Sequence, residues 1–152
     1  MNGQAANSYL KTKVLTATPE QLQLMLYDGA IRFCDQARVA IQEKNWEQSY
    51  NLIIRVQRIL VEMLCTLKHD INPDLCGKLA SLYNYAYRKL VEASVGHDVA
   101  ALEEAVSVLR FQRETWVLLL DKLSRAKATN AARKLDLPAP DARMEASISV
   151  RG

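Results

Sequence analysis

The sequence contains few of the residues that staple a chain or interrupt its regular structure. Its 152 residues include five glycines, four prolines and three cysteines. The cysteines are odd in number and form no CxxC pair, which argues against a disulfide scaffold. A chain of this length buries about 70% of the surface of its unfolded form, so it needs no such staple. These properties predict one compact domain in a reducing compartment, with Cys34, Cys65 and Cys76 as apolar packing residues.

The sequence also lacks long apolar runs and any concentration of positive charge. No segment approaches the roughly 18 uninterrupted apolar residues of a membrane-spanning helix, and the N-terminal residues lack the apolar core of a signal peptide. Residues 17–126 carry 13 basic and 14 acidic side chains, while the two ends together carry seven basic and three acidic ones. A nucleic-acid surface needs clustered basic side chains on the folded body. We therefore expect a soluble, cytoplasmic protein with no nucleic-acid partner and no membrane insertion.

Sequence motifs for catalysis and for cofactor binding are absent. The chain has no nucleophile elbow, phosphate-binding loop, dinucleotide fingerprint or HExxH pair. Its two histidines, His69 and His97, are expected at helix ends, where they suit neither a di-iron bundle nor a phosphotransfer site. The sequence thus predicts no catalytic residue, no metal site and no cofactor.

Four helices are predicted from their capping residues. Thr18 precedes Pro19 and stands three residues before Gln21, which is the spacing of a capping box. Gly96 is expected to end the third helix in the left-handed conformation. The short connections favour antiparallel neighbours, so we predict an all-α fold, an antiparallel up-and-down four-helix bundle with flexible N- and C-terminal tails. The predicted helices run from Pro19 to about Lys44, from Asn45 to about His69, from Asn72 to Gly96 and from Asp98 through Leu123, with a frayed extension over Ser124 to Lys134.

Each predicted helix carries an apolar stripe that we expect to face the core. The stripes follow from placing side chains at about 100° per residue. The core positions predicted in this way are Leu22, Leu26, Phe33, Ala37 and Ala40; Trp46, Ile53, Leu60, Leu64 and Leu67; Leu75, Leu79, Leu82, Ala86, Leu90 and Ala93; and Leu102, Ala105, Leu109, Trp116, Leu120 and Leu123.

Further apolar side chains lie outside these stripes. The apolar arc of the second helix spans roughly 220°, whereas a core-facing stripe needs about 100°. Soluble proteins seldom expose large apolar patches, so the extra side chains predict a surface that receives an apolar partner. Flanking positions can also be buried between two neighbouring helices, and this alternative stays open for each strip. The candidate partner-binding residues are Leu24, Tyr27 and Ile31 on the first helix, Tyr50, Ile54 and Val61 on the second, Tyr85 on the third, and Val108, Phe111 and Leu118 on the fourth.

Four segments occur in the order typical of one protein family. They are VLTATPEQLQLMLYDGAIRF at residues 14–33, NLIIRVQRILVEMLCTL from Asn51, LYNYAYRKLVEASVGHDVAALEEAV from Leu82, and RETW at residues 113–116. Together they resemble the flagellin export chaperones of the FliS family over about residues 9–124. The HDINPDL segment and the long tail after Lys127 depart from the usual pattern of that family.

The resemblance implies a cytosolic, non-enzymatic chaperone. Such a chaperone binds the C-terminal segment of newly made flagellin in apolar grooves, prevents premature polymerisation and assists delivery to the flagellar type III export apparatus. An export-gate component and other flagellar regulators are implied as further partners. The N-terminal tail is expected to cover part of the groove, which adds Tyr9 and Val14 to the candidate partner-binding residues. The implied organisation is a tail at 1–16, a chaperone domain at 17–129 and a disordered tail at 130–152.

A different class of function stays open at this point. A regulatory adapter that binds a folded flagellar or anti-sigma partner fits the same apolar strips, and a ligand-binding or phosphotransfer bundle is a third hypothesis. Co-purification with the C-terminal region of flagellin distinguishes the chaperone from the adapter, because an adapter recovers folded partners instead.

Overall fold

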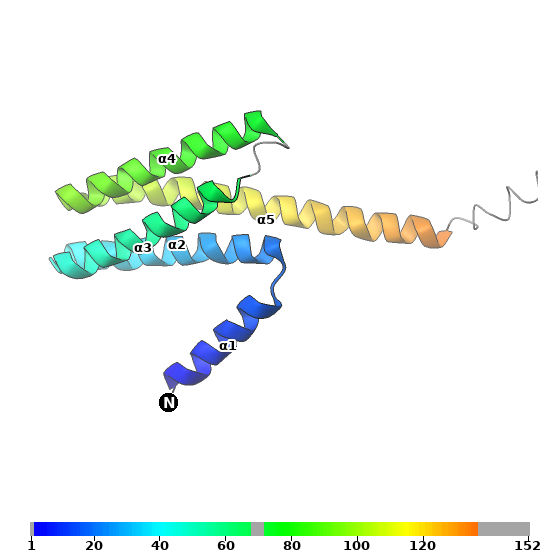
Figure 1. Cartoon of the computed structure of the whole chain (residues 1–152), viewed down its shortest axis with the longest axis horizontal. Helices are drawn as coiled ribbons and strands as arrows, with labels where there is room; N and C mark the ends of the chain where they lie inside the picture. The colour runs from blue at the N-terminus through cyan, green and yellow to red at the C-terminus, as the bar shows by residue number, and fades with distance from the viewer. Residues whose placement is uncertain (1, 68–71, 137–152) are drawn as a thin grey trace, which may run out of the picture. The chain divides into compact units, whose positions relative to one another are not determined.

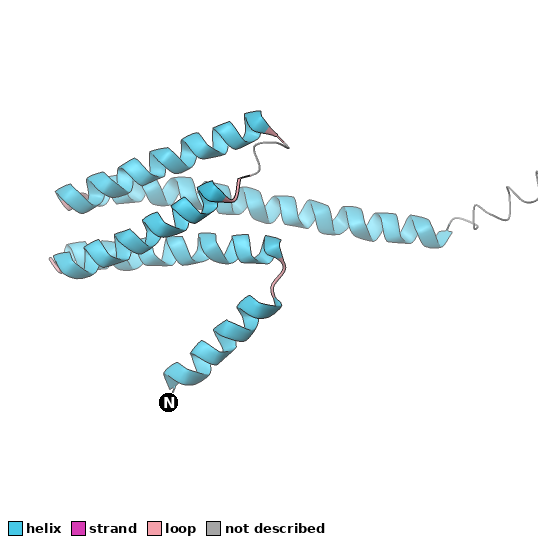
Figure 2. Cartoon of the chain, viewed as in Figure 1, coloured by secondary structure: helices cyan, strands magenta, loops and turns pink. Residues whose placement is uncertain are grey.

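A computed structural model describes residues 2–67 and 72–136 of the chain. Every regular element within these ranges is a helix, as Figure 2 shows. The chain divides into two compact units, Met1–Trp116 and Val117–Gly152. The helices are α1 (Asn2–Thr16), α2 (Pro19–Gln42), α3 (Trp46–Cys65), α4 (Pro73–Gly96) and α5 (Val99–Asp136).

Capping side chains fix where the four bundle helices begin. Thr18 Oγ1 accepts a hydrogen bond from the Gln21 amide at 3.2 Å, and Gln21 Oε1 accepts one from the Thr18 amide at 3.0 Å. This reciprocal pair is the predicted capping box. Side-chain oxygens of Asn45, Asn72 and Asp98 accept from the amide three residues further on, each at 3.2 Å. The predicted starts of α2, α3, α4 and α5 are therefore confirmed.

The ends of two helices differ from the prediction. The left-handed residue after α4 is His97, with a φ of 50°, whereas Gly96 stays within the helix. The helix therefore makes its final turn one residue later than the glycine suggested. α3 ends at Cys65, before the predicted His69, which lies outside the described residues.

The terminal segments contain more helix than predicted. α5 continues to Asp136, beyond the predicted tail boundary at residue 130, because neither glycine nor proline occurs between Gly96 and Pro138. The segment predicted to be a flexible N-terminal tail forms α1, in which the hydroxyls of Thr12 and Thr16 donate to carbonyls one turn earlier. The predicted tail at 137–152 lies outside the described residues.

Polar contacts establish the direction of the helices. At one end, Trp116 Nε1 of α5 donates to the carbonyl of Glu20 in α2 at 2.9 Å. Further along, Arg38 of α2 pairs with Glu103 of α5, so positions rise along one helix as they fall along the other. Short turns join α2 to α3 and α4 to α5, and Figure 1 shows α2, α3, α4 and the first part of α5 side by side. The predicted antiparallel four-helix bundle is confirmed.

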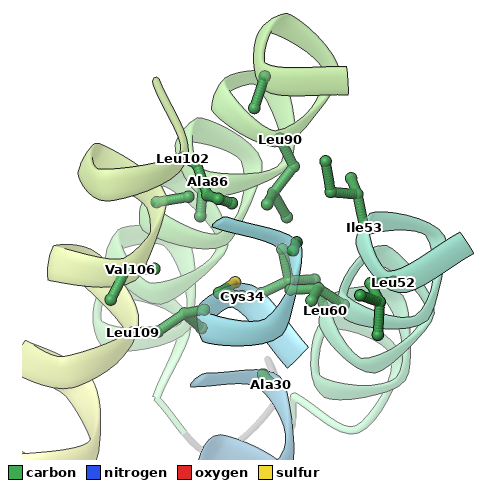
Figure 3. Packing of buried hydrophobic residues seen from close by; sticks show 14 of the residues in the cluster. Ala30, Cys34, Leu52, Ile53, Leu60, Ala86, Leu90, Leu102, Val106 and Leu109 are labelled. Atoms are coloured by element: carbon green, nitrogen blue, oxygen red, sulfur yellow. The ribbon is translucent and has the colours of Figure 1, made fainter. Parts of the chain in front are cut away.

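Buried side chains recur at alternating spacings of three and four residues on all four bundle helices. This spacing lets the side chains of one helix insert between those of its neighbours. α2 contributes mainly small side chains and α3 mainly bulky ones, and Figure 3 shows side chains from all four helices converging around Cys34. The buried positions with this spacing are Tyr27, Ala30, Cys34, Ala37 and Ile41; Ser49, Ile53, Val56, Leu60 and Met63; Tyr83, Ala86, Leu90 and Ala93; and Leu102, Ala105, Leu109 and Gln112.

Some predicted core residues are exposed instead. Leu82 is exposed because the three-and-four spacing of α4 runs through its neighbour Tyr83. Leu75 and Trp46 lie in the first turns of α4 and α3, where fewer neighbouring helices cover them. The Trp46 ring stacks on the ring of His97 with centroids 3.8 Å apart. The predicted core residue Leu123 is exposed as well.

A buried hydroxyl pair joins Tyr27 of α2 to Tyr83 of α4. The two oxygens lie 2.7 Å apart, and the residues are only 3% and 1% exposed. Burial, and then the hydrogen bond to Tyr27, raises the pKa of Tyr83 far above its ordinary value. Tyr27, predicted as a partner contact, is thus a core residue. The prediction was wrong because the hydroxyl group finds a partner inside the bundle.

Replacing Thr18 by Ala should lower the free energy of unfolding by about 0.5–2 kcal/mol, because the Gln21 amide loses its acceptor. Denaturant unfolding measures the change. Thr115→Ala, in the middle of α5, is the control and should change stability much less. Equal stability of Thr18→Ala and the parent would show that the capping box contributes nothing.

Tyr27→Phe and Tyr83→Phe should each lower the free energy of unfolding by about 1–3 kcal/mol, because each leaves the other hydroxyl buried without its partner. The double variant should lose less than the two single losses together. Denaturant unfolding of the four proteins completes the cycle, and strictly additive losses would contradict coupling between the hydroxyls.

Candidate binding groove

A groove of about 670 Å³ lies along α3 beside α4. Its apolar surface comes from Ile54 and Val61 of α3 and from the ring of Tyr87 of α4, with polar groups around them. The complete lining is Ile54, Gln57, Arg58, Val61, Glu62, Cys65, Thr66 and Tyr87.

The wide apolar surface of α3 produces this groove. Ile53 and Leu60 are fully buried, whereas Ile54 is half-buried and Val61 is 47% exposed. Successive residues on a helix are about 100° apart, so packing the first of each pair into the core leaves the second at its edge. A concave site with apolar anchors and polar surroundings is suited to the side chains of an extended or helical segment.

Two of the predicted partner-binding residues, Ile54 and Val61, come together in the groove. The sequence reasoning missed Arg58, Cys65 and Tyr87. Arg58 and Cys65 follow the same spacing of three and four residues as Ile54 and Val61. This spacing could have identified them, but the search for apolar strips did not consider it. Cys65 was interpreted as a packing residue, but it is exposed because α3 ends there.

The other predicted partner-binding residues do not line this groove. Ile31 and Val108 are half-buried against the core, so part of each side chain already packs within the bundle. The remaining role of these residues as partner contacts stays a prediction. Exposed among them are Tyr9, Val14, Tyr50, Tyr85, Phe111 and Leu118, and half-buried are Leu24, Ile31 and Val108.

A second hollow, of about 280 Å³, lies between α2 and α5 and is strongly charged. Its ion pairs include Arg113 with Asp28, and Arg110 with Asp35 at 3.5 Å. Exposed pairs of this kind add little stability. Acidic and basic side chains are equal in number in its lining, so the hollow has no excess charge. The lining is Asp28, Ile31, Arg32, Asp35, Arg110, Arg113 and Glu114.

Tyr85 takes part in a polar contact between α4 and α5. Its hydroxyl donates to Glu104 at 2.9 Å, and Lys89 Nζ lies 3.1 Å from the same carboxylate. The hydrogen bond to Glu104 raises the pKa of Tyr85, while Lys89 lowers the pKa of Glu104. The polar tip of this predicted contact residue is therefore already engaged within the bundle.

Within residues 2–67 and 72–136 no three His, Cys, Asp or Glu side chains are grouped so that they could hold a metal ion. No helix of these ranges is long and apolar enough to cross a membrane.

Known proteins match this chain over most of its length. The family model described as flagellar protein FliS matches residues 1–133. The chain belongs to the FliS family. Its relatives include the flagellar secretion chaperone FliS of Bacillus subtilis, 34% identical over 109 residues that cover 72% of this chain and 80% of the relative. The flagellar secretion chaperone FliS of Campylobacter jejuni is 29% identical over 115 residues, covering 76% of this chain and 90% of the relative.

A solved structure has the same fold. It is a crystal structure of a flagellar chaperone from bacteria, with a TM-score of 0.65 and 20% identity, covering 80% of this chain and 99% of that one. The family model and the relatives, rather than this structure, confirm the resemblance to the FliS family. In this FliS-family chain the RETW segment is a structural tie, because Arg113 pairs with Asp28 and Trp116 bonds to the carbonyl of Glu20.

The groove position of Cys65 predicts its reactivity. Iodoacetamide should modify Cys65 in the native protein and leave Cys34 unmodified until the protein is unfolded. Cys34 is fully buried, and burial raises the pKa of its thiol to about 12, so little thiolate forms. Peptide mass spectrometry reads both sites, with the denatured protein as control. Equal native modification of Cys34 and Cys65 would contradict the described burial.

Proposed function

We propose that this chain is a flagellar secretion chaperone that binds the C-terminal segment of newly made flagellin. By holding this segment in the cytoplasm, it keeps flagellin from polymerising prematurely and assists its delivery to the flagellar type III export apparatus. The apolar groove of α3 and α4 is the observation that carries the proposal. Membership of the FliS family and relatives named flagellar secretion chaperones support it.

The groove suits a client segment that has no core of its own. Such a segment is held by inserting apolar side chains between those of the chaperone, and ordering it consumes part of the interaction free energy. Ile54 and Val61 lie seven residues apart on α3, a rise of about 10 Å, which matches two apolar side chains two turns apart on a client helix. We infer that the protein works by this binding, without catalysis or a cofactor.

Changing Ile54 or Val61 to Ser should weaken binding of the flagellin C-terminal region by about 1–3 kcal/mol each, since each change removes apolar surface that the client covers. Titration calorimetry with flagellin from the same organism measures the affinity. The parent complex should show a negative heat-capacity change and a weak dependence on salt.

Val39→Ser is the matched control for Val61→Ser. Val39 is 50% exposed on α2 and does not line the groove, so this change should leave affinity unaltered. Thermal unfolding confirms that all variants are folded. If both groove variants bind with the affinity of the parent, or if about 0.5 M salt abolishes binding, the client does not bind through the apolar groove. Either result favours an adapter that binds its partner electrostatically.

A further inference from the structure

A polar hollow of about 230 Å³ adjoins the apolar groove on α3. Ile54 and Arg58 line both, so a segment lying in the groove also reaches the edge of the hollow. The lining of the hollow is Gln48, Asn51, Leu52, Ile54, Arg55 and Arg58. It contains two guanidinium groups and two amides but no carboxylate, which is a donor-rich set.

The two arginines of this hollow, like Arg32 and Arg88, form no ion pair within the described residues, which distinguishes them from three other arginines of the bundle. Arg38, Arg110 and Arg113 are each paired with an acidic side chain. Arg58 has no carboxylate within 4.0 Å among the residues that the structure describes. Arg55 likewise lacks an acidic partner there, and its guanidinium lies 5.5 Å from the centre of the Phe33 ring, which orients the group without neutralising it.

An unpaired guanidinium beside an apolar groove favours a carboxylate on the occupant. The planar group can donate two parallel hydrogen bonds to a carboxylate, and Arg58 is exposed and thus open to such a partner. We propose that the client segment in the groove places a carboxylate on Arg58, with Arg55 adding positive charge. This inference rests on the proposed function and specifies the chemistry of the client that the groove selects.

The spacing on α3 turns this proposal into a sequence pattern. Arg58 lies four residues after Ile54 and three before Val61, so it stands between the two apolar contacts. A client helix aligned with α3 presents apolar side chains at positions i and i+7 and an Asp or Glu at i+3 or i+4. A client that ends within the groove presents its terminal carboxylate instead.

The test measures the affinity of the flagellin C-terminal region for the parent chain, Arg58→Gln and Arg58→Lys at low salt. Arg58→Gln should weaken binding about tenfold, and Arg58→Lys should recover only part of the loss because the two-bond geometry is absent. Arg88→Gln is the matched control, since Arg88 is an exposed arginine of α4 that lines neither the apolar groove nor the polar hollow beside it. It should bind like the parent.

Client variants then identify the carboxylate. Each Asp or Glu of the segment is changed to its amide, and the chain terminus is amidated in a separate arm. One of these changes should weaken binding about tenfold to the parent but less than twofold to Arg58→Gln. The proposal is overturned if Arg58→Gln binds the client with the affinity of the parent. It is also overturned if every client change lowers the affinity by the same factor for the parent and for Arg58→Gln, because no client carboxylate is then coupled to Arg58.

The same panel separates this proposal from the proposed function. If Ile54→Ser and Val61→Ser weaken binding while Arg58→Gln does not, the groove holds the client and the carboxylate proposal is wrong. If none of the three changes affects affinity, the client does not lie in the groove and both proposals are overturned.

Discussion

The bulky buried stripe of α3 packs against the small side chains of α2, and the rest of the bundle depends on this fit. Figure 3 shows the bulky side chain of Leu60 beside the small side chains of Cys34 and Ala30 on the opposite helix, and all three are fully buried. Alternating spacings of three and four residues keep the two stripes facing each other over their length. α4 and α5 complete the core around them, and surface ion pairs tie the helices together without determining the packing.

The same constraint explains why α3 also carries the candidate binding groove. Once one face of α3 is packed into the core, apolar residues at the edge of that face are only partly covered within the bundle. Ile54 and Val61 are left in this position, and Tyr87 of α4 forms the opposite side of the groove. One face of α3 thus serves the core, and the proposed binding function falls to its flank.

Local chemistry made part of the fold predictable. The caps at Thr18, Asn45 and Asp98 act within three residues, so the starts of the helices were readable in the sequence. The register of the core was harder to predict, because α4 buries Tyr83 rather than its neighbour Leu82, and the hydroxyl of Tyr83 pairs with that of Tyr27 on another helix. The sequence of one helical segment does not show which side chains of other helices will contact it.

The groove was predictable to a similar degree. Periodicity identified Ile54 and Val61 as apolar residues outside the core stripe, but the other candidates that it identified do not line the groove. Which of them share one concave site depends on which helix packs beside α3. The polar members of the lining, Arg58 above all, could not be found by apolar pattern, since an exposed arginine on a helix is ordinary until its surroundings are known.

The position of the client on α3 tests the central claim most directly. In a complex of the methyl-labelled chain with the unlabelled flagellin C-terminal segment, nuclear Overhauser contacts to the client should arise from the methyl groups of Ile54 and Val61. The buried neighbours Ile53 and Leu60 should show none. Contacts from Val39 instead, with Ile54 and Val61 unchanged from the free protein, would contradict the assignment of the groove.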